Sequence, residues 1–165
     1  MILAIDPGNE ESAYCVIDKK TYKPIEFGKV KNEALLDYIF DDLPDKVDTL
    51  VIEKIASYGM SVGQTVFDTC IWTGRFVQFY LDFTSPYSQK VEYIYRKEEK
   101  MNLCHSMKAK DSNIRQALID RFAQFDFKNG KGKKVNKDFF YGFSKDIWAA
   151  FAVGCTYLDK QKEGL

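Results

Sequence analysis

The sequence has few residues suited to a zinc site or a disulfide framework. Its only histidine is His105, and its four cysteines, Cys15, Cys70, Cys104 and Cys155, stand far apart with no Cys-x-x-Cys pair. Structural zinc sites take four Cys or His ligands at short spacings, and disulfide frameworks are typical of small secreted domains. The pattern therefore favours reduced thiols with a mostly structural role.

The sequence also lacks an apolar run long enough to cross a membrane, and nothing resembles a secretory signal. The longest apolar region, residues 62–83, is interrupted by polar and charged side chains, whereas a spanning helix needs about 20 predominantly apolar residues. We expect a soluble protein in the cytoplasm, which would be the host-cell cytoplasm if a phage encodes it. At 165 residues, the chain should form one domain, residues 1–165, that buries about two-thirds of its unfolded surface.

The chain has no net charge, because 24 Lys and Arg residues balance 24 Asp and Glu residues. A neutral chain by itself predicts no nucleic-acid partner. The charges are unevenly distributed, however: residues 1–83 carry 8 basic and 14 acidic side chains, and residues 84–145 carry 14 basic and 7 acidic ones. Such asymmetry can mark a surface that binds polyanions.

The stretch from Ile2 to Asp6 predicts a strand that is buried on both faces and ends on a carboxylate. Pro-Gly then turns the chain, and in isolation Asp6 would be a turn residue. The pattern returns from Thr49 to Glu53, in a second apolar run that closes on a carboxylate. This repetition favours a shared role for Asp6 and Glu53.

The remaining pattern predicts an α/β fold with a mixed five-stranded sheet, in which the first three strands are antiparallel and the others parallel, flanked by helices. Strands over 12–18 and 25–30 continue the first strand as a meander, and residues 34–43 form a helix with Asn32 as its N-cap. Strand-helix-strand connections are right-handed and make their strands parallel. The strand that ends at Glu53 can therefore lie beside the first, with both carboxylates at one edge of the sheet.

The second half of the chain supplies the other elements of this fold. They are a helix starting near Val62, a strand over 91–96, helices over 97–105 and 111–125, a flexible basic loop over 129–137 and a last helix with Ser144 as its N-cap. Small residues would let the last helix pack close against the sheet. Asp146 falls in its first turn, on the face that packs inward.

Three carboxylates thus have related settings: Asp6, Glu53 and Asp146. Like charges brought together raise one another's pKa unless cations neutralise them, and Mg²⁺ or Mn²⁺ are natural partners of carboxylate oxygens. A two-metal site suits attack of water on a phosphodiester, because one ion generates the nucleophile and the other stabilises the leaving oxygen. Taken singly, Asp146 could instead complement the helix dipole.

The helix that starts near Val62 has two apolar faces. One consists of Val66, Phe67, Cys70, Ile71, Gly74, Val77 and Leu81, and the other of Trp72, Phe76, Phe79 and Phe83. The sheet of a monomer covers only one face. We therefore assign Trp72, Phe76 and Phe79 to the interface of a homodimer, with the alternative that Trp72 and Phe76 fold under a loop.

The order of these elements resembles the ribonuclease H-like superfamily and, within it, the RuvC-like Holliday junction resolvases of the compact phage type. The resemblance covers nearly the whole chain. It rests on the stretches Ile2 to Gly8, Val51 to Lys54 and Asp146 to Ala152, which resemble the first acidic strand, the second acidic strand and the final helix of those enzymes.

This resemblance implies a homodimeric, magnesium-dependent endonuclease that places paired nicks in branched DNA, such as four-way junctions, during DNA recombination and repair. Asp6, Glu53 and Asp146 map onto its metal ligands, and Mn²⁺ could substitute for Mg²⁺. Many relatives carry a further Asp or His three residues before the last Asp, where this chain has Phe143. The second metal is then in question, unless Asp138 substitutes.

Basic residues fit a surface whose phosphate contacts position DNA without reading its sequence. They are Lys131, Lys133, Lys134 and Lys137 from the basic loop, and Arg96, Lys97, Lys100, Lys108 and Lys110 after the fifth strand. Tyr58, which follows Glu53, stands where relatives carry an aromatic residue that stacks near the junction centre. Solvated lysines and an exposed loop tyrosine without a function are the alternative interpretation.

Two other functions stay open. One is a RuvC-like RNA-processing nuclease with the same fold, and the other is a catalytically weak protein that binds branched DNA, which Phe143 suggests. The two-faced helix favours the junction resolvase, because paired nicks need two active sites.

Overall fold

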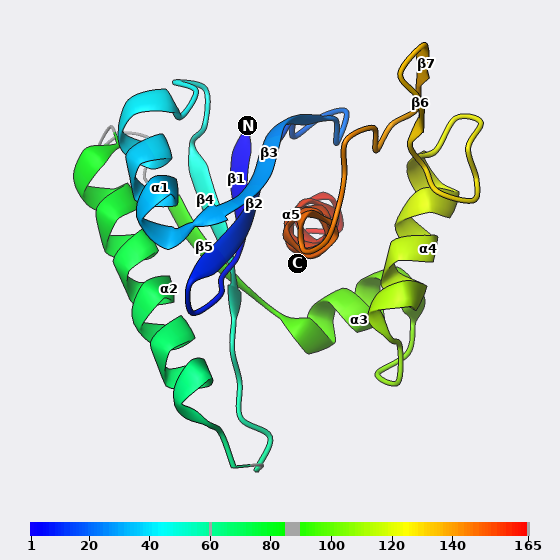
Figure 1. The fold of residues 1–165 in the computed structure, drawn as a ribbon. Helices are drawn as coiled ribbons and strands as arrows, with labels where there is room; N and C mark the ends of the chain where they lie inside the picture. Colours follow the sequence, from blue (N-terminus) through cyan, green and yellow to red (C-terminus); the bar gives the residue numbers. More distant parts are fainter. Residues whose placement is uncertain (60, 85–89, 165) are drawn as a thin grey trace.

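The computed structural model describes residues 1–59, 61–84 and 90–164, and a five-stranded sheet lies at its centre (Figure 1). The strand order in the sheet is β3-β2-β1-β4-β5. The strands span Ile2–Asp6 (β1), Glu11–Ile17 (β2), Pro24–Lys31 (β3), Thr49–Lys54 (β4) and Lys90–Tyr95 (β5). The helices span Asn32–Asp37 (α1), Gln64–Phe83 (α2), Arg96–Cys104 (α3), Asp111–Phe122 (α4) and Ile147–Lys162 (α5), and a π-helical segment over Tyr38–Asp42 (η1) follows α1.

The central strand β1 pairs on both sides. It runs antiparallel to β2 and parallel to β4, and β4 runs parallel to β5. The predicted antiparallel meander and parallel crossover are therefore confirmed. Because Ile5 pairs with Ile52, the residues that follow them, Asp6 and Glu53, lie at the same edge of the sheet.

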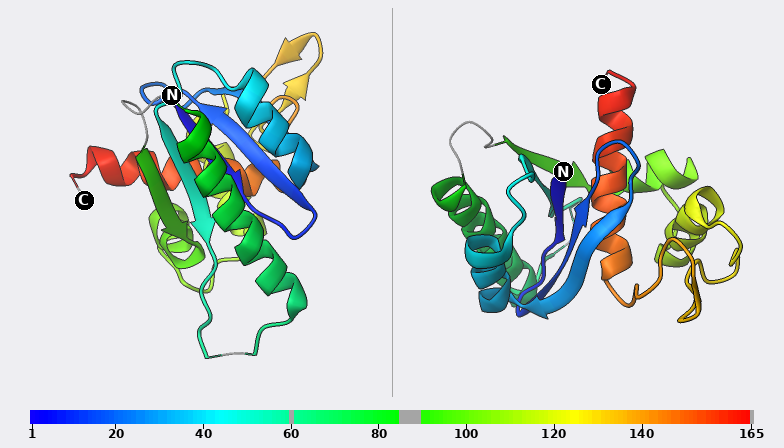
Figure 2. Two further views of the ribbon diagram at one scale, coloured as in Figure 1. Left: turned by 90° about the vertical axis from the view of Figure 1, so that its left-hand side faces the viewer. Right: turned by 90° about the horizontal axis from the view of Figure 1, so that it is seen from above.

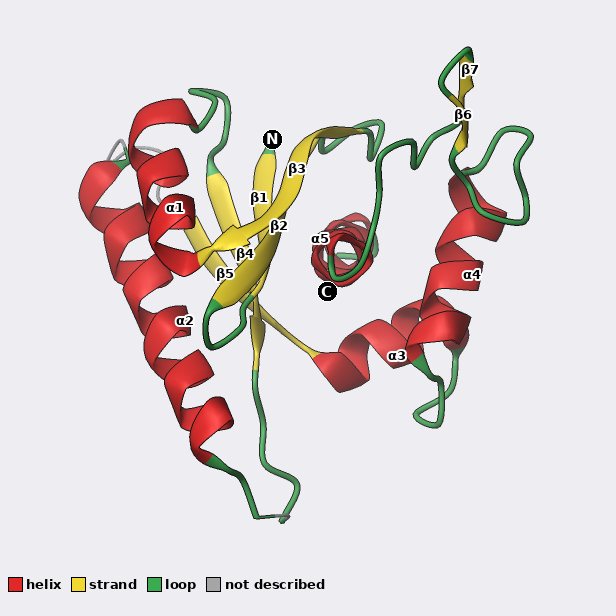
Figure 3. Ribbon diagram, viewed as in Figure 1, coloured by secondary structure: helices red, strands yellow, loops and turns green. Residues whose placement is uncertain are grey.

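Helices cover both faces of this sheet (Figures 2 and 3). Alternate residues of β1 point to opposite faces, so that Leu3 and Ile5 join the core beneath α1 and α2, and Ile2 and Ala4 join the core beneath α5. Figure 1 shows α5 between the sheet and the pair formed by α3 and α4. At Gly154 an added Cβ would lie 2.9 Å from the Cβ of Ala4, which confirms that α5 packs close against the sheet.

The structure reverses the predicted faces of α2. Phe76 is fully buried in the monomer, and Trp72 and Phe79 pack against the same core. The large apolar side chains exposed on this helix are instead Phe67 and Ile71, at 54% and 61% exposure, together with Phe83 at its last residue, at 52%. The assignment of Trp72, Phe76 and Phe79 to a dimer interface was wrong, because these rings fill the space above the aliphatic side chains of the sheet. The alternative, in which a loop covers Trp72 and Phe76, was wrong for the same reason.

The start of the last helix also differs from the prediction. The helix α5 begins at Ile147 with Asp146 as its N-cap residue, and Ser144 lies before it. Lys145 adopts a left-handed backbone conformation, with φ of +46°, which separates Ser144 from the helix. The basic loop over 129–137 contains a short antiparallel ribbon formed by Gly132–Lys133 (β6) and Asn136–Lys137 (β7).

None of the helices in the described part of the chain is long and apolar enough to cross a membrane.

Candidate active site

Asp6 and Glu53 meet at the carboxyl ends of β1 and β4. The side chains of Asp6 and Glu53 lie close enough there for each to affect the pKa of the other. Burial raises the pKa of Asp6, and the charge of Glu53 raises it further. Burial likewise raises the pKa of Glu53. Ionising both carboxyl groups at this edge is therefore unfavourable without a cation.

The turn after Asp6 is fixed by side chains from β2 and α1. The backbone N–H of Gly8 donates to Oγ of Ser12 (3.0 Å), which donates to Oδ1 of Asn32 (2.6 Å), and the Asn32 amide donates back to the carbonyl of Gly8 (3.0 Å). Asn32 was wrongly predicted as an N-cap: it is the first residue of α1, and Lys31 precedes it as the N-cap. Its buried amide finds partners in the turn instead, and so holds the chain that leaves Asp6.

Asp146 lies near this pair but faces solvent. Its side chain is 51% exposed, and its Oδ2 accepts a hydrogen bond from Nζ of Lys29 on β3 at 2.5 Å. The prediction of an inward-facing Asp146 was wrong, because the carboxylate sits just before the helix and turns toward Lys29. Its charge still contributes to the raised pKa of Asp6, so the three predicted carboxylates share one region.

A fourth carboxylate, Glu99 of α3, also lies here and was missed in the sequence. It is fully buried, and its Oε2 pairs with Nη1 of Arg96 at 2.5 Å. Burial raises the pKa of Glu99 well above its usual range, and the charges of Glu53 and Asp6 add to that increase. The other guanidinium nitrogen of Arg96, Nη2, pairs with Asp111. Arg96 was predicted to bind DNA phosphate, but the structure shows it neutralising these carboxylates.

Neither Phe143 nor Asp138 adds a ligand to the site. Phe143 is buried among aromatic rings, with its ring centroid 4.7 Å from Phe27 and 5.1 Å from Phe140. Asp138 accepts backbone N–H bonds from Gln124, Phe125, Asp126 and Phe139. Burial by itself would raise the pKa of Asp138, but these donors outweigh it and lower the pKa to about 2. Asp138 therefore orders its own loop rather than substituting for an acid at position 143.

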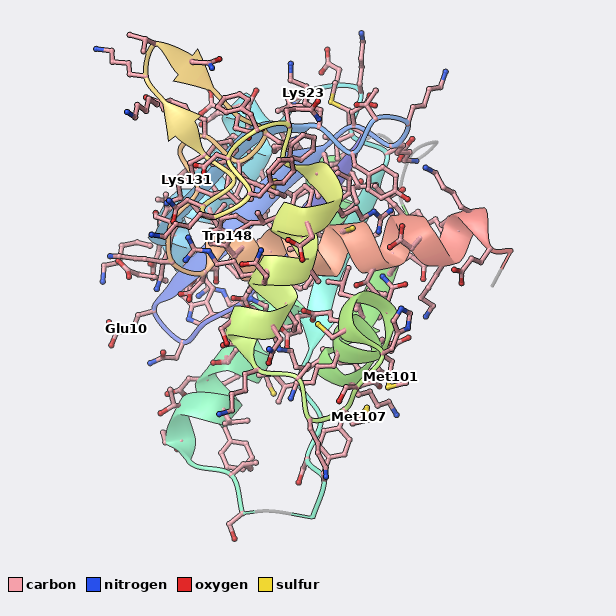
Figure 4. The ribbon with its side chains drawn as sticks, turned by 90° about the vertical axis from the view of Figure 1, so that its right-hand side faces the viewer. Glu10, Lys23, Met101, Met107, Lys131 and Trp148 are labelled. Carbon is pink, nitrogen blue, oxygen red and sulfur yellow. The ribbon has the colours of Figure 1, made fainter. Side chains whose placement is uncertain are left out.

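A groove that carries several basic side chains, with the carboxylate of Asp111 among them, leads away from Asp146. A cavity of about 570 Å³ is lined by Arg115, Lys128 and Lys145 among others. A smaller cavity of about 70 Å³ shares Arg115, Lys145 and Trp148 with it and also contacts Arg96 and Asp146. Figure 4 looks onto this side of the molecule, with Trp148 near the start of α5 and Lys131 after α4. This groove could not be predicted from the sequence, because its cations come from three separate segments.

The other predicted DNA-binding residues are distributed around this region. Tyr58 is 59% exposed on the loop that follows Glu53. Lys108 and Lys110 are exposed between α3 and α4, Lys133, Lys134 and Lys137 are exposed on the β6–β7 ribbon, and Lys131 is half-buried beside it. These side chains, with that of Lys131 only in part, are exposed and can contact a polyanion. The Arg96 side chain is instead paired with Glu99 and Asp111.

The chemical type of these side chains suits a hard divalent cation, because carboxylate oxygens are the ligands that Mg²⁺ and Mn²⁺ prefer. The pKa values of Asp6 and Glu53 are both raised, which is a cost that a bound cation would offset, and the buried Oε1 of Glu99 has no hydrogen-bond partner among the described residues. Within residues 1–59, 61–84 and 90–164, however, no three Asp, Glu, His or Cys side chains already converge as a metal-binding group. Asp146 is paired with Lys29 instead, so these residues fit a cation only if Asp146 reorients.

Comparisons with known proteins bear on the fold. A scan against protein-family models finds no match, and neither does a search of curated proteins. Among solved structures, RuvC from Thermus thermophilus in complex with a Holliday junction substrate aligns with a TM-score of 0.67 and 11% identity, over 99% of this chain and 95% of that one. Fowlpox virus resolvase in complex with Holliday junction DNA aligns with a TM-score of 0.54 and 15% identity, over 97% and 99% of the two chains. The chain therefore has the ribonuclease H-like fold of these resolvases, as the sequence resemblance predicted.

Proposed function

We propose that this chain is a metal-dependent endonuclease that nicks branched DNA and resolves four-way junctions as a homodimer. The observation that carries the proposal is the Asp6–Glu53 carboxyl pair at the ends of two adjacent parallel strands. It stands in a fold that matches RuvC over nearly the whole chain. The proposed unit is a single nuclease domain over residues 1–165.

Asp6 and Glu53, joined by Asp146, would hold Mg²⁺, or Mn²⁺ in its place. When bound, such an ion lowers the pKa of a water molecule and stabilises the leaving oxygen of a phosphodiester. The raised pKa of Asp6 means that it keeps its proton to a higher pH than an ordinary aspartate. Both groups can act as ligands only after that proton has left, so we expect cleavage to increase as the pH rises.

The cationic groove is the proposed path of the DNA strand. Arg115, Lys128 and Lys145 line it, and it leads directly to Asp146. The guanidinium of Arg115 lies 4.7 Å from the centroid of the Trp148 ring, which orients it by a cation–π contact. Phosphate contacts from such cations position DNA without reading its bases, as a structure-selective enzyme requires.

The proposed dimer uses the exposed face of α2. Phe67 and Ile71 are more than half exposed, and Cys70 and Gly74 lie exposed beside them. A Cβ added at Gly74 would meet nothing within 4 Å, so a second helix could approach closely there. A twofold pair of such helices would give the two active sites that paired nicks require.

A substrate panel tests the proposal. A four-way DNA junction, duplex DNA and an RNA–DNA hybrid are each incubated with Mg²⁺ and with the wild type, Asp6→Asn or Asp45→Asn, the last a control at an exposed aspartate in the loop before β4. We expect paired nicks in the junction from the wild type and from Asp45→Asn, and none from Asp6→Asn. Equal cleavage by Asp6→Asn would refute the proposed site, and cleavage confined to the hybrid would favour an RNA-processing nuclease.

The pairing of Asp146 with Lys29 favours a second candidate, a catalytically weak protein that binds branched DNA. Tight binding of the junction without nicking in either Mg²⁺ or Mn²⁺ would support that candidate over the nuclease.

A further inference from the structure

Glu99 is an unusual residue for the position it occupies. Its side chain has no exposed surface, although a buried carboxylate is costly unless hydrogen bonds satisfy its oxygens. One oxygen, Oε2, is satisfied by Arg96. The other, Oε1, is buried and has no partner in the part of the chain that the structure describes. Such an orphaned oxygen calls for a ligand or a structural reason.

The fold brings Glu99 to the acidic edge of the sheet. β5 runs parallel to β4, with Ile94 paired with Glu53 and Tyr95 paired with Lys54. α3 begins at the next residue, Arg96, so Glu99 lies one turn of helix beyond the end of the strand beside Glu53. Figure 1 shows α3 leaving the sheet from this end of β5.

The charges at this edge do not balance. The charges of Asp6 and Glu53 act on Glu99, so the three carboxyl groups lie in one region of the described chain without converging there as a preformed metal-binding group, and the charge of Arg96 acts on each of them. Arg96 also pairs with Asp111, so its charge is divided. A divalent cation among these oxygens would satisfy the orphaned atom and restore the balance.

We propose that Glu99 is an additional oxygen ligand of the cation that the Asp6–Glu53 edge binds, with Arg96 holding the other oxygen of the carboxylate in place. This inference rests on the metal dependence in the proposed function. It assigns the site carboxylates from β1, β4 and α3, with Asp146 completing it from the start of α5.

Calorimetric titration of the metal-free protein with Mn²⁺ tests the assignment without relying on cleavage. Glu99→Gln keeps the shape of the side chain and should weaken Mn²⁺ binding by about tenfold or more, which is the loss typical of disturbed metal sites. The matched control is Glu98→Gln, the same change one residue earlier in α3, where the side chain pairs with Lys160 at 2.5 Å. It should bind Mn²⁺ as the wild type does. Equal affinity of Glu99→Gln and the wild type would overturn the assignment.

A double variant separates a ligand from a residue that acts through Arg96. If Glu99→Gln weakened binding only by releasing Arg96 into the site, Arg96→Met with Glu99→Gln would restore wild-type affinity and overturn the proposal. If Glu99 is a ligand, the double variant stays about tenfold weaker or more. The double variant removes both partners of a buried pair, which destabilises a protein less than removing one partner. It therefore serves as the test variant if Glu99→Gln alone unfolds in EDTA. A wild type that binds no Mn²⁺ would instead refute the proposed metal dependence itself.

Discussion

The orientation of α2 can be tested by removing one ring from each of its faces. Phe76 has no exposed surface and lies in the core beneath the helix, with its ring centroid 5.7 Å from that of Trp72. Deleting a buried phenylalanine costs the transfer free energy of the ring and also leaves a cavity, which together amount to about 3–5 kcal/mol. Because domains of this size are stable by about 5–15 kcal/mol, Phe76→Ala should lose a large fraction of that stability.

Phe67 provides the matched control on the opposite face. It is 54% exposed on the same helix, so Phe67→Ala should change the free energy of unfolding of the monomer by about 0.5 kcal/mol or less. The assay is guanidinium-induced unfolding followed by circular dichroism at low protein concentration. At higher concentration Phe67→Ala should lose more, because the proposed dimer stabilises the folded state by mass action.

The result that would refute this reasoning is a larger loss for Phe67→Ala than for Phe76→Ala at low protein concentration. That outcome would mean that α2 is rotated by about half a turn and that the face carrying Trp72, Phe76 and Phe79 is the free one. Equal and small losses would show that neither face contacts a well-packed core.

Three further predictions concern the pH response, the groove and the dimer. The folded protein holds the Asp6 proton to a higher pH than the unfolded chain, where the pKa has its ordinary value of 3.8. The free energy of unfolding in EDTA, measured with urea, should therefore fall as the pH rises from about 4 through the folded pKa. A flat pH profile that is the same in Asp6→Asn would contradict this. Arg115→Ala combined with Lys145→Ala should weaken junction binding and reduce the slope of log affinity against log salt by about 0.9 for each lost phosphate contact, whereas Lys46→Ala, an exposed lysine before β4, should leave the slope unchanged. Ile71→Glu should sediment as a monomer and Ile25→Glu, at 41% exposure on β3, as a dimer; an unchanged dimer in Ile71→Glu would place the interface elsewhere.

The strands that carry Asp6 and Glu53 were predictable because buried parallel strands are uninterrupted apolar runs. A carboxylate at the end of such a run can only stand at the sheet edge, and the right-handed crossover makes the two edges coincide. The orientation of α2 was not predictable in the same way. Both of its faces are apolar, and periodicity identifies faces without saying which one meets the sheet.

Asp146 and Glu99 show why side chains at the site were harder to predict than the strands. Successive helical residues are rotated by about 100°, so a helix that starts at Ile147 rather than near Ser144 gives Asp146 a different direction. Its partner Lys29 lies 117 positions earlier in the sequence, beyond any local pattern. Glu99 sits in the run Arg96 to Lys100, which reads as a solvated charged surface, and only the tertiary packing of α3 buries it.

The two basic side chains at the acidic edge, Lys29 and Arg96, differ in how firmly they are paired. This difference assigns distinct roles to their partners, Asp146 and Glu99. The Lys29–Asp146 pair is partly exposed, with side chains at 27% and 51% exposure, and a pair of that kind contributes about 0–1 kcal/mol. The Arg96–Glu99 pair includes a fully buried carboxylate, and removing one partner of a buried pair costs about 3–5 kcal/mol. An arriving divalent cation can therefore draw Asp146 away from Lys29 at little cost, while Glu99 remains fixed by Arg96. Asp6, Glu53 and Glu99 then form the rigid part of the proposed site, and Asp146 is the ligand that completes it, next to the groove proposed for DNA.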